Sequence, residues 1–174
     1  MFTENDFKKT IREIPDYPKK GILFYDITTL LKDGKAYNEL ITAICDSLRG
    51  LDIDVVVGPE ARGFVIGAPV AYGINAGFVL ARKPGKLPAD VYSISYGLEY
   101  GHDVLEIHKD AIKPGMRVAI VDDLLATGGT ALATAKLIGS MDAEVVGLRF
   151  AIELEDLNGR ANLADYDVQS VMKY

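Results

Sequence analysis

The chain has 174 residues, of which 49% are hydrophobic and 25% charged, and its formal net charge is −6. This length and composition predict one globular domain, residues 1–174, with a sizeable core. The negative charge argues against a broad basic face that binds nucleic acid, but it leaves room for a small basic pocket. No apolar stretch approaches the length of a membrane span, and the single Cys45 cannot form an internal disulfide. The sequence therefore predicts a cytoplasmic protein.

The first 34 residues show little regular patterning. Thr3 and Asp6 have the spacing of a capping box, which predicts a first helix that ends near Pro15. From Asp16 to Asp33 the chain is rich in Pro, Gly and Asp. This composition predicts an ordered irregular segment, which we expect to cover another part of the protein as a flap.

From about residue 35 on, predicted helices and strands alternate. Asp33 can cap a helix in which four apolar residues fall at helical spacing, and Gly50 ends it; the four are Leu40, Ile41, Ile44 and Leu48. The further elements expected in chain order are a strand at 53–57, a helix at 63–72, a strand at 77–80, a hairpin of strands at 92–96 and 104–108, a strand at 117–121, a helix with Ala131, Ala135 and Ile138 on one face, and a strand starting at 144–148. This alternation predicts an α/β fold with a mainly parallel sheet, whose ligands bind beyond the carboxyl ends of the strands.

The strongest signal for function follows the strand at 117–121. Asp122 and Asp123 come at the exit of this strand, and the turn Thr127-Gly128-Gly129-Thr130 then opens a helix. The glycines let the backbone come close to a ligand, and the free N–H groups, the helix N-terminus and the threonine hydroxyls favour a phosphate. The two carboxylates suit neighbouring sugar hydroxyls, or waters on a metal. Together the residues predict a phosphorylated sugar as ligand.

Each half of this motif has an ordinary structural interpretation. An acidic pair after a strand is often a solvated turn, and a Thr-Gly-Gly-Thr turn is often only a helix cap. Their joint occurrence after a buried strand is far more specific, and it favours phosphate binding. Two rival phosphate motifs, G-x-x-x-x-G-K-[ST] and G-x-G-x-x-G after a first strand, are absent from the sequence.

The loop at 122–130 resembles the signature with which type I phosphoribosyltransferases bind 5-phosphoribosyl-1-diphosphate (PRPP). From about Asp16 to Arg160 the chain resembles the adenine-specific members of that family. The resemblance is carried by residues 21–24 and 26–27, 60–63, 82–88, 96–101, 122–130, 152–154, 157 and 159–160. It implies a type I phosphoribosyltransferase fold, a mainly parallel twisted sheet flanked by helices, with a hood at about 1–34, a core at about 35–174 and a mobile hairpin loop. The implied reaction transfers the 5-phosphoribosyl group from PRPP to adenine and gives AMP and diphosphate.

For the signature loop, the resemblance implies the same ligand contacts as the reasoning from the residues alone. The 5-phosphate is assigned to the backbone amides and hydroxyls of Ala126, Thr127, Gly128, Gly129 and Thr130. The 2- and 3-hydroxyls of the ribose are assigned to Asp122 and Asp123.

The implied diphosphate site begins after the strand at 53–57, at Ala61, Arg62 and Gly63. The guanidinium of Arg62 can hold two oxygens at once, and this residue is also an implied catalytic group. The next loop adds the positive charges of Arg82, Lys83 and Lys86. One such lysine alone is usually solvated surface, but three cations in one loop favour an anion site.

The remaining assignments rest on the resemblance alone. Glu99 is implied to lie near the base and to handle its proton as a catalytic group, and Tyr100 to cover the diphosphate. Adenine is implied to meet backbone groups of Leu23 and Tyr25 and to stack on Phe24, although Phe24 as ordinary core fits the sequence equally well. At Tyr25 the chain departs from the family, in which arginine is frequent, so a contact made by that arginine has no counterpart here.

The resemblance also implies Mg²⁺ bound mainly through PRPP and diphosphate, without direct protein ligands, and a homodimer with no nucleic-acid or membrane partner. Two alternatives stay open. The same chemistry could act on hypoxanthine, guanine or xanthine. The chain could instead be a PRPP-sensing regulator without catalysis, but such a protein needs a nucleic-acid-binding surface, against which the acidic charge argues.

Overall fold

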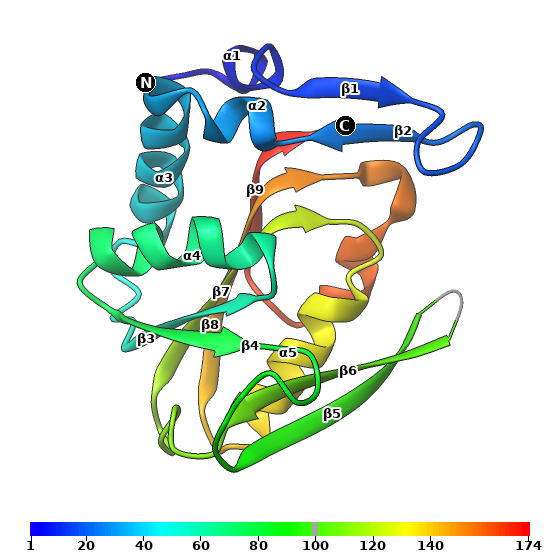
Figure 1. The fold of residues 1–174 in the computed structure, drawn as a ribbon. Helices are drawn as coiled ribbons and strands as arrows, with labels where there is room; N and C mark the ends of the chain where they lie inside the picture. Colours follow the sequence, from blue (N-terminus) through cyan, green and yellow to red (C-terminus); the bar gives the residue numbers. More distant parts are fainter. Residues whose placement is uncertain (99–100) are drawn as a thin grey trace.

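A computed structural model describes residues 1–98 and 101–174, and a five-stranded sheet lies at its centre (Figure 1). The strand order is β4-β3-β7-β8-β9, and all neighbouring pairs are parallel. The bounds are β3 (Val55–Pro59), β4 (Gly77–Ala81), β7 (Arg117–Leu125), β8 (Glu144–Glu153) and β9 (Val168–Lys173). Because the strands are parallel, their carboxyl ends meet at one edge of the sheet. The predicted α/β class is confirmed.

Helices cover both faces of this sheet. On one face lie α3 (Gly34–Leu48) and α4 (Arg62–Gly73), and on the other lies α5 (Gly129–Gly139). Successive strand residues alternate between the two buried clusters, since Val56 packs with α3 and α4 while Val57 packs with α5. The Asp33 carboxylate accepts hydrogen bonds from the first backbone amides of α3, as predicted.

The hood, residues 1–34, is more regular than predicted. The capping box of Thr3 and Asp6 is present, but α1 (Glu4–Lys8) ends at Lys8, so the predicted helix to Pro15 is wrong. The bounds of the elements that follow are β1 (Arg12–Pro15), β2 (Leu23–Asp26) and α2 (Thr28–Leu31). The two strands pair antiparallel, and this pairing of residues distant in sequence overrides the local helix signal. The β1–β2 ribbon lies over the carboxyl ends of β7 and β8 (Figure 1).

The predicted hairpin is confirmed and is longer than expected. It consists of β5 (Val91–Leu98) and β6 (Gly101–His108), which pair antiparallel beside α5. Glu99 and Tyr100 lie outside the described residues.

The last third of the chain differs from the prediction in two respects. β7 continues through Asp122 and Asp123 to Leu125, because its pairing with β8 extends to Leu125 and Glu153. The prediction that the acidic pair follows the end of the strand is therefore wrong, although a turn still separates β7 from α5. After β8, two short 3₁₀ helices, η1 (Glu155–Leu157) and η2 (Gly159–Leu163), lead into β9, a strand that the sequence analysis does not predict.

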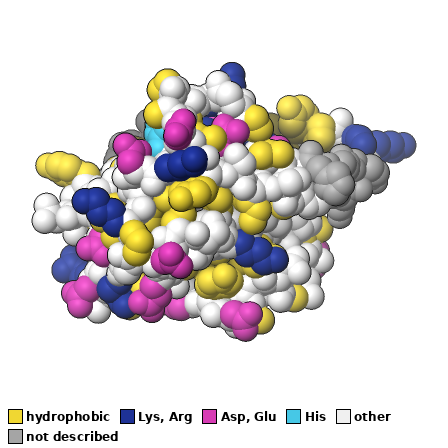
Figure 2. Space-filling model, turned by 90° about the horizontal axis from the view of Figure 1, so that it is seen from below, with side chains coloured by type: hydrophobic (Ala, Val, Ile, Leu, Met, Phe, Trp, Pro, Cys, Tyr) yellow, Lys and Arg dark blue, Asp and Glu magenta, His cyan; other side chains and the backbone are white. Residues whose placement is uncertain are grey.

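The surface seen from below the view of Figure 1 has mixed charge. Acidic and basic side chains are interspersed there among hydrophobic ones (Figure 2). In the described part of the chain, no helix has both the length and the apolar character needed to cross a membrane.

Candidate functional site

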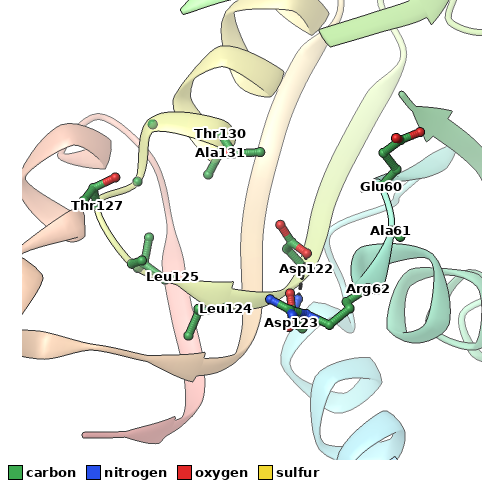
Figure 3. Close-up of a pocket in the computed structure, with 13 residues that line it drawn as sticks. Glu60, Ala61, Arg62, Asp122, Asp123, Leu124, Leu125, Thr127, Thr130 and Ala131 are labelled. Carbon is green, nitrogen blue, oxygen red and sulfur yellow. Dashed lines mark hydrogen bonds and ion pairs between the residues drawn. The ribbon is translucent and has the colours of Figure 1, made fainter. Parts of the chain in front are cut away.

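A cavity of about 380 Å³ lies at the carboxyl edge of the sheet (Figure 3). It is lined by residues 60–62, which lead from the end of β3 into α4, and by residues 122–131, which run from the end of β7 through the turn into α5. The fold thus brings Arg62 together with the predicted phosphate loop and the acidic pair, although Arg62 and Asp123 are 61 positions apart in sequence.

The phosphate loop requires glycine at its centre. Gly128 caps α5 with a left-handed backbone, φ 81°, and a Cβ there would lie 2.6 Å from the carbonyl oxygen of Gly159. Asn162 holds the loop from the same side, because its Nδ2 donates to the carbonyl oxygen of Thr127 at 2.8 Å. The first turn of α5 therefore presents its unpaired N–H groups at the cavity, where the helix dipole favours an anion.

The acidic pair is linked to Arg62. Asp123 is only 8% exposed, and its carboxylate forms an ion pair with the Arg62 guanidinium. The Oδ1 atom of Asp122 accepts a hydrogen bond from the Asp123 amide at 2.8 Å. Burial, and next the charge of Asp123, raise the pKa of Asp122 well above its ordinary value. Among the described residues, Asp123 is thus the one member of the pair that forms an ion pair, while the charge of Arg62 acts only weakly on Asp122.

Gly63, predicted to contact diphosphate, does not line the cavity. It is buried at the start of α4, where a Cβ would lie 2.9 Å from Oδ1 of Asp122. Glycine at this position lets α4 begin directly against β7, with Arg62 beside the acidic pair.

The predicted basic loop lies beside the cavity, and two of its cations have acidic partners. Arg82 pairs with Glu60 at 2.7 Å, and Lys83 pairs with Asp103 of β6. Arg82 also donates to the carbonyl oxygen of Lys86 at 3.3 Å. Burial is the largest influence and would raise the pKa of Glu60. The hydrogen bonds from Arg82 and from the Lys83 backbone, together with the charges of Arg82 and Lys86, outweigh it, so the pKa of Glu60 is lowered. Sequence reasoning had not assigned Glu60 to the site, although its position beside Ala61 and Arg62 was a usable signal.

The hood strand β2 lies near the cavity without lining it. Of the residues predicted to meet adenine, Leu23 is exposed, Phe24 packs edge-on to Tyr17 at 5.1 Å, and Tyr25 stacks on Tyr174.

The end of β2 lies close enough to the cavity for the charge of Arg62 to affect Asp26. Hydrogen bonds from Thr28 lower the pKa of Asp26, and the charges of Arg12 and then Arg62 add smaller contributions in the same direction. The end of β2 is thus close enough to Arg62 for the charges of Asp26 and Arg62 to interact.

The hairpin contributes a residue that the sequence analysis did not identify. The Oη atom of Tyr96 lies 3.3 Å from Oγ1 of Thr130 and 3.3 Å from Oδ2 of Asp103. Tyr96 therefore connects β5 to the phosphate loop. The motif did not reveal it, because this contact depends on the packing of β5 against α5.

Comparison with known proteins agrees with this geometry. A family model described as "Phosphoribosyl transferase domain" matches residues 27–171. An adenine phosphoribosyltransferase of Alkaliphilus metalliredigens is 63% identical over 164 residues, which are 94% of this chain and 96% of that protein. The corresponding protein of Desulfitobacterium hafniense is 59% identical over 97% of this chain and 98% of its own length.

Solved structures give the same result. The crystal structure of adenine phosphoribosyltransferase from Thermoanaerobacter pseudethanolicus has a TM-score of 0.95 at 55% identity, and the match covers 99% of this chain and 100% of that one. The enzyme of Saccharomyces cerevisiae, solved with an imino-altritol bisphosphate and adenine, has a TM-score of 0.91 at 36% identity, with 97% of each chain covered.

Proposed function

The chain belongs to the adenine phosphoribosyltransferase family, and on that premise we propose that its cavity transfers the 5-phosphoribosyl group from PRPP to adenine, yielding AMP and diphosphate. One observation supports this proposed function most directly. A glycine-rich helix N-terminus, an acidic pair and an arginine line one cavity of a chain that is 63% identical to an adenine phosphoribosyltransferase. A phosphorylated sugar with a second anionic group has the charges that these three features complement.

The signature loop holds the 5-phosphate. Backbone amides and hydroxyls from Ala126 to Thr130 surround it, and the dipole of α5 adds a favourable potential. The Asn162 and Tyr96 contacts support the loop on either side.

The acidic pair holds the ribose through its 2- and 3-hydroxyls. Because burial makes ionisation of Asp122 unfavourable, hydroxyl donors that replace water around this carboxylate stabilise its charged form. Asp123 keeps Arg62 at the mouth of the cavity, where the guanidinium meets the leaving diphosphate.

The diphosphate lies between Arg62 and the basic loop. The Ala61 amide and the charges of Arg82, Lys83 and Lys86 complete this site in our proposal. Since Arg82 and Lys83 already pair with Glu60 and Asp103, the diphosphate competes with these carboxylates for them. Tyr100 covers the diphosphate in the proposal.

Adenine lies under β2, with its ring on Phe24 and its polar edge at backbone groups of Leu23 and Tyr25. Catalysis then needs no protein nucleophile. The bond from the anomeric carbon to diphosphate breaks as an adenine nitrogen bonds to the same carbon, through a transition state with oxocarbenium character. Glu99 handles the proton of the base, and the residues above contribute positioning and charge stabilisation.

The family generally uses Mg²⁺ with PRPP, and the residues of the cavity are compatible with it. Among residues 1–98 and 101–174, no group of three or more His, Cys, Asp or Glu side chains could hold a metal. The oxygen donors of Asp122 and Asp123 nevertheless suit waters on a Mg²⁺ ion. Bound mainly through PRPP, the ion would neutralise charge on diphosphate. We further propose a cytoplasmic homodimer.

An assay of the purified chain with PRPP, Mg²⁺ and one purine at a time tests the function. Adenine should give AMP and diphosphate, while hypoxanthine, guanine and xanthine should give at most a small fraction of that rate. A higher rate with another purine would change the substrate, and PRPP binding without product would favour the regulator. In the same assay Glu99→Leu should lower kcat more than it raises the KM for PRPP, and an unchanged kcat would reject its role with the proton.

A further inference from the structure

The end of β9 lies beside the hood (Figure 1). Tyr174, which follows β9, stacks on Tyr25 of β2 with ring centroids 3.9 Å apart and an interplanar angle of 35°. The ammonium group of Lys8 from α1 lies 4.8 Å from the centre of the same Tyr174 ring. One aromatic ring thus contacts two separate elements of the hood.

The main chain fixes this ring to the core. The Tyr174 amide donates to the carbonyl oxygen of Glu153 at 2.9 Å, and the Tyr174 carbonyl accepts from the amide of Glu155 at 2.8 Å. Beside it, the Lys173 amide donates to the Glu4 carboxylate of α1 at 3.0 Å. Tyr174 is therefore held by β8 and η1, and it supports the hood from the side of the core.

The geometry of β2 connects this support to the substrate. In a strand, successive side chains point to opposite faces. Because Tyr25 faces Tyr174, the side chains of Phe24 and Asp26 face the other way, and the pKa of Asp26 already responds to Arg62 of the cavity. A shift of Tyr25 toward or away from Tyr174 would therefore also move Phe24 relative to the cavity.

We infer that Tyr174 is a positioning residue for adenine, since its ring supports Tyr25 and thereby sets the position of β2 over the cavity. This inference rests on the proposed function. It also gives Tyr25 a partner within this chain, at the position where the family frequently has arginine.

The aromatic ring of Tyr174, and not its hydroxyl group, supports Tyr25 and the hood. The Oη atom of Tyr174 is buried and has no hydrogen-bond partner among the described residues. Burial, with a smaller contribution from Glu13, raises the pKa of Tyr174 to about 12, so the side chain is neutral at physiological pH. A buried hydroxyl without a partner is unfavourable. Tyr174→Phe should therefore keep the support of the hood, while Tyr174→Ala should lose it.

Steady-state kinetics of the full chain test the inference. For Tyr174→Ala we expect the KM for adenine to rise about tenfold, equivalent to about 1.4 kcal/mol, while the KM for PRPP changes less than about twofold. Tyr174→Phe should stay within about twofold of the wild type in both. Tyr72→Ala, at a tyrosine that is 90% exposed on α4, is the matched control and should change neither constant. Tyr174→Leu, which keeps apolar bulk, replaces the alanine variant if that does not fold.

Two kinetic results would overturn the inference. One is an adenine KM for Tyr174→Ala within about twofold of the wild type. The other is an equal effect on both substrates, because it would indicate a general structural role. Amide hydrogen exchange of residues 12–26 gives a readout that does not need activity, and Tyr174→Ala should accelerate it. If the wild type forms no AMP, the proposed function fails, whereas unchanged exchange in Tyr174→Ala would refute the support of the hood by this ring.

Discussion

At the scale of single residues, the acidic pair combines a function with a cost in stability. The pKa of Asp122 is raised in the folded protein, so the fold disfavours the charge that ribose binding needs. A carboxyl group with a raised folded pKa stabilises the fold at low pH, and this contribution is lost as the pH rises through the folded pKa. Above that pH the fold contains an unfavourable buried charge, which Asp122→Asn removes.

We therefore predict that Asp122→Asn increases the free energy of unfolding at pH 7.5, by on the order of 1 kcal/mol, and greatly lowers activity. The gain should shrink as the pH falls toward the ordinary pKa of aspartate. Urea unfolding at several pH values measures it. Asp123→Asn is the contrasting control, because it removes the partner of Arg62 and should bring no gain. A gain for Asp122→Asn that does not depend on pH would contradict this account.

At the scale of elements, the turn from β7 to α5 depends on Gly128. Its left-handed backbone costs other residues about 1–2 kcal/mol, and a Cβ would also contact the carbonyl oxygen of Gly159. Gly128→Ala should lower the melting temperature and raise the KM for PRPP at least tenfold. Gly139→Ala is the control in the same helix, because Gly139 has open space around it and an ordinary backbone. Equal effects of the two substitutions would contradict the prediction.

The segment that supports this turn is held by Glu153. Its carboxylate is 4% exposed and accepts two hydrogen bonds of 2.7 Å from Arg160, which follows Gly159 in η2. Burial opposes ionisation, but Arg160 and Ser170 outweigh it, so the pKa of Glu153 is lowered. Stability from a lowered carboxyl pKa is present above the unfolded pKa and is lost as the pH falls through the folded one.

Glu153→Gln should therefore destabilise the protein most at neutral pH, by about 1–2 kcal/mol because the partner Arg160 is 40% exposed, and less below pH 4. It should also weaken PRPP binding, because η2 lies directly behind the phosphate loop. Thermal unfolding and the KM for PRPP, both followed against pH, check these two effects. If the loss of stability is equal at pH 7 and at pH 4, the lowered pKa has no part in it.

The elements also show how far the sequence could predict the structure. Apolar runs rich in β-branched residues, such as 118–121, identified the buried parallel strands, since a strand covered on both faces has that pattern. The helix predicted to Pro15 was wrong, because β1 forms through pairing with β2, which no local signal encodes. In the same way, the signature loop and Arg62 were identified from motifs. Glu60 and Tyr96 were missed, because their contacts join residues 22 and 34 positions apart.

At the scale of the whole molecule, distant parts of the chain are joined by a buried arginine. Arg149 of β8 is 2% exposed. Its guanidinium donates to Ser47 of α3 and to Asp167 before β9, at distances of 2.6–3.1 Å. With Lys173 bonded to Glu4, the hood, α3 and the far edge of the sheet share one set of contacts.

This connectivity predicts that hood and core unfold together, as one domain of residues 1–174. The chain has no tryptophan and nine tyrosines, so tyrosine emission averages over the whole chain. The single tryptophan of a Tyr17→Trp variant would report on the hood, while far-UV circular dichroism reports on the sheet and helices. In a urea titration the two signals should superimpose on one transition. An earlier transition in fluorescence alone would instead make the hood a separate unit. If the chain is a homodimer, the shared midpoint should fall when the protein is diluted tenfold, because dissociation favours the unfolded state.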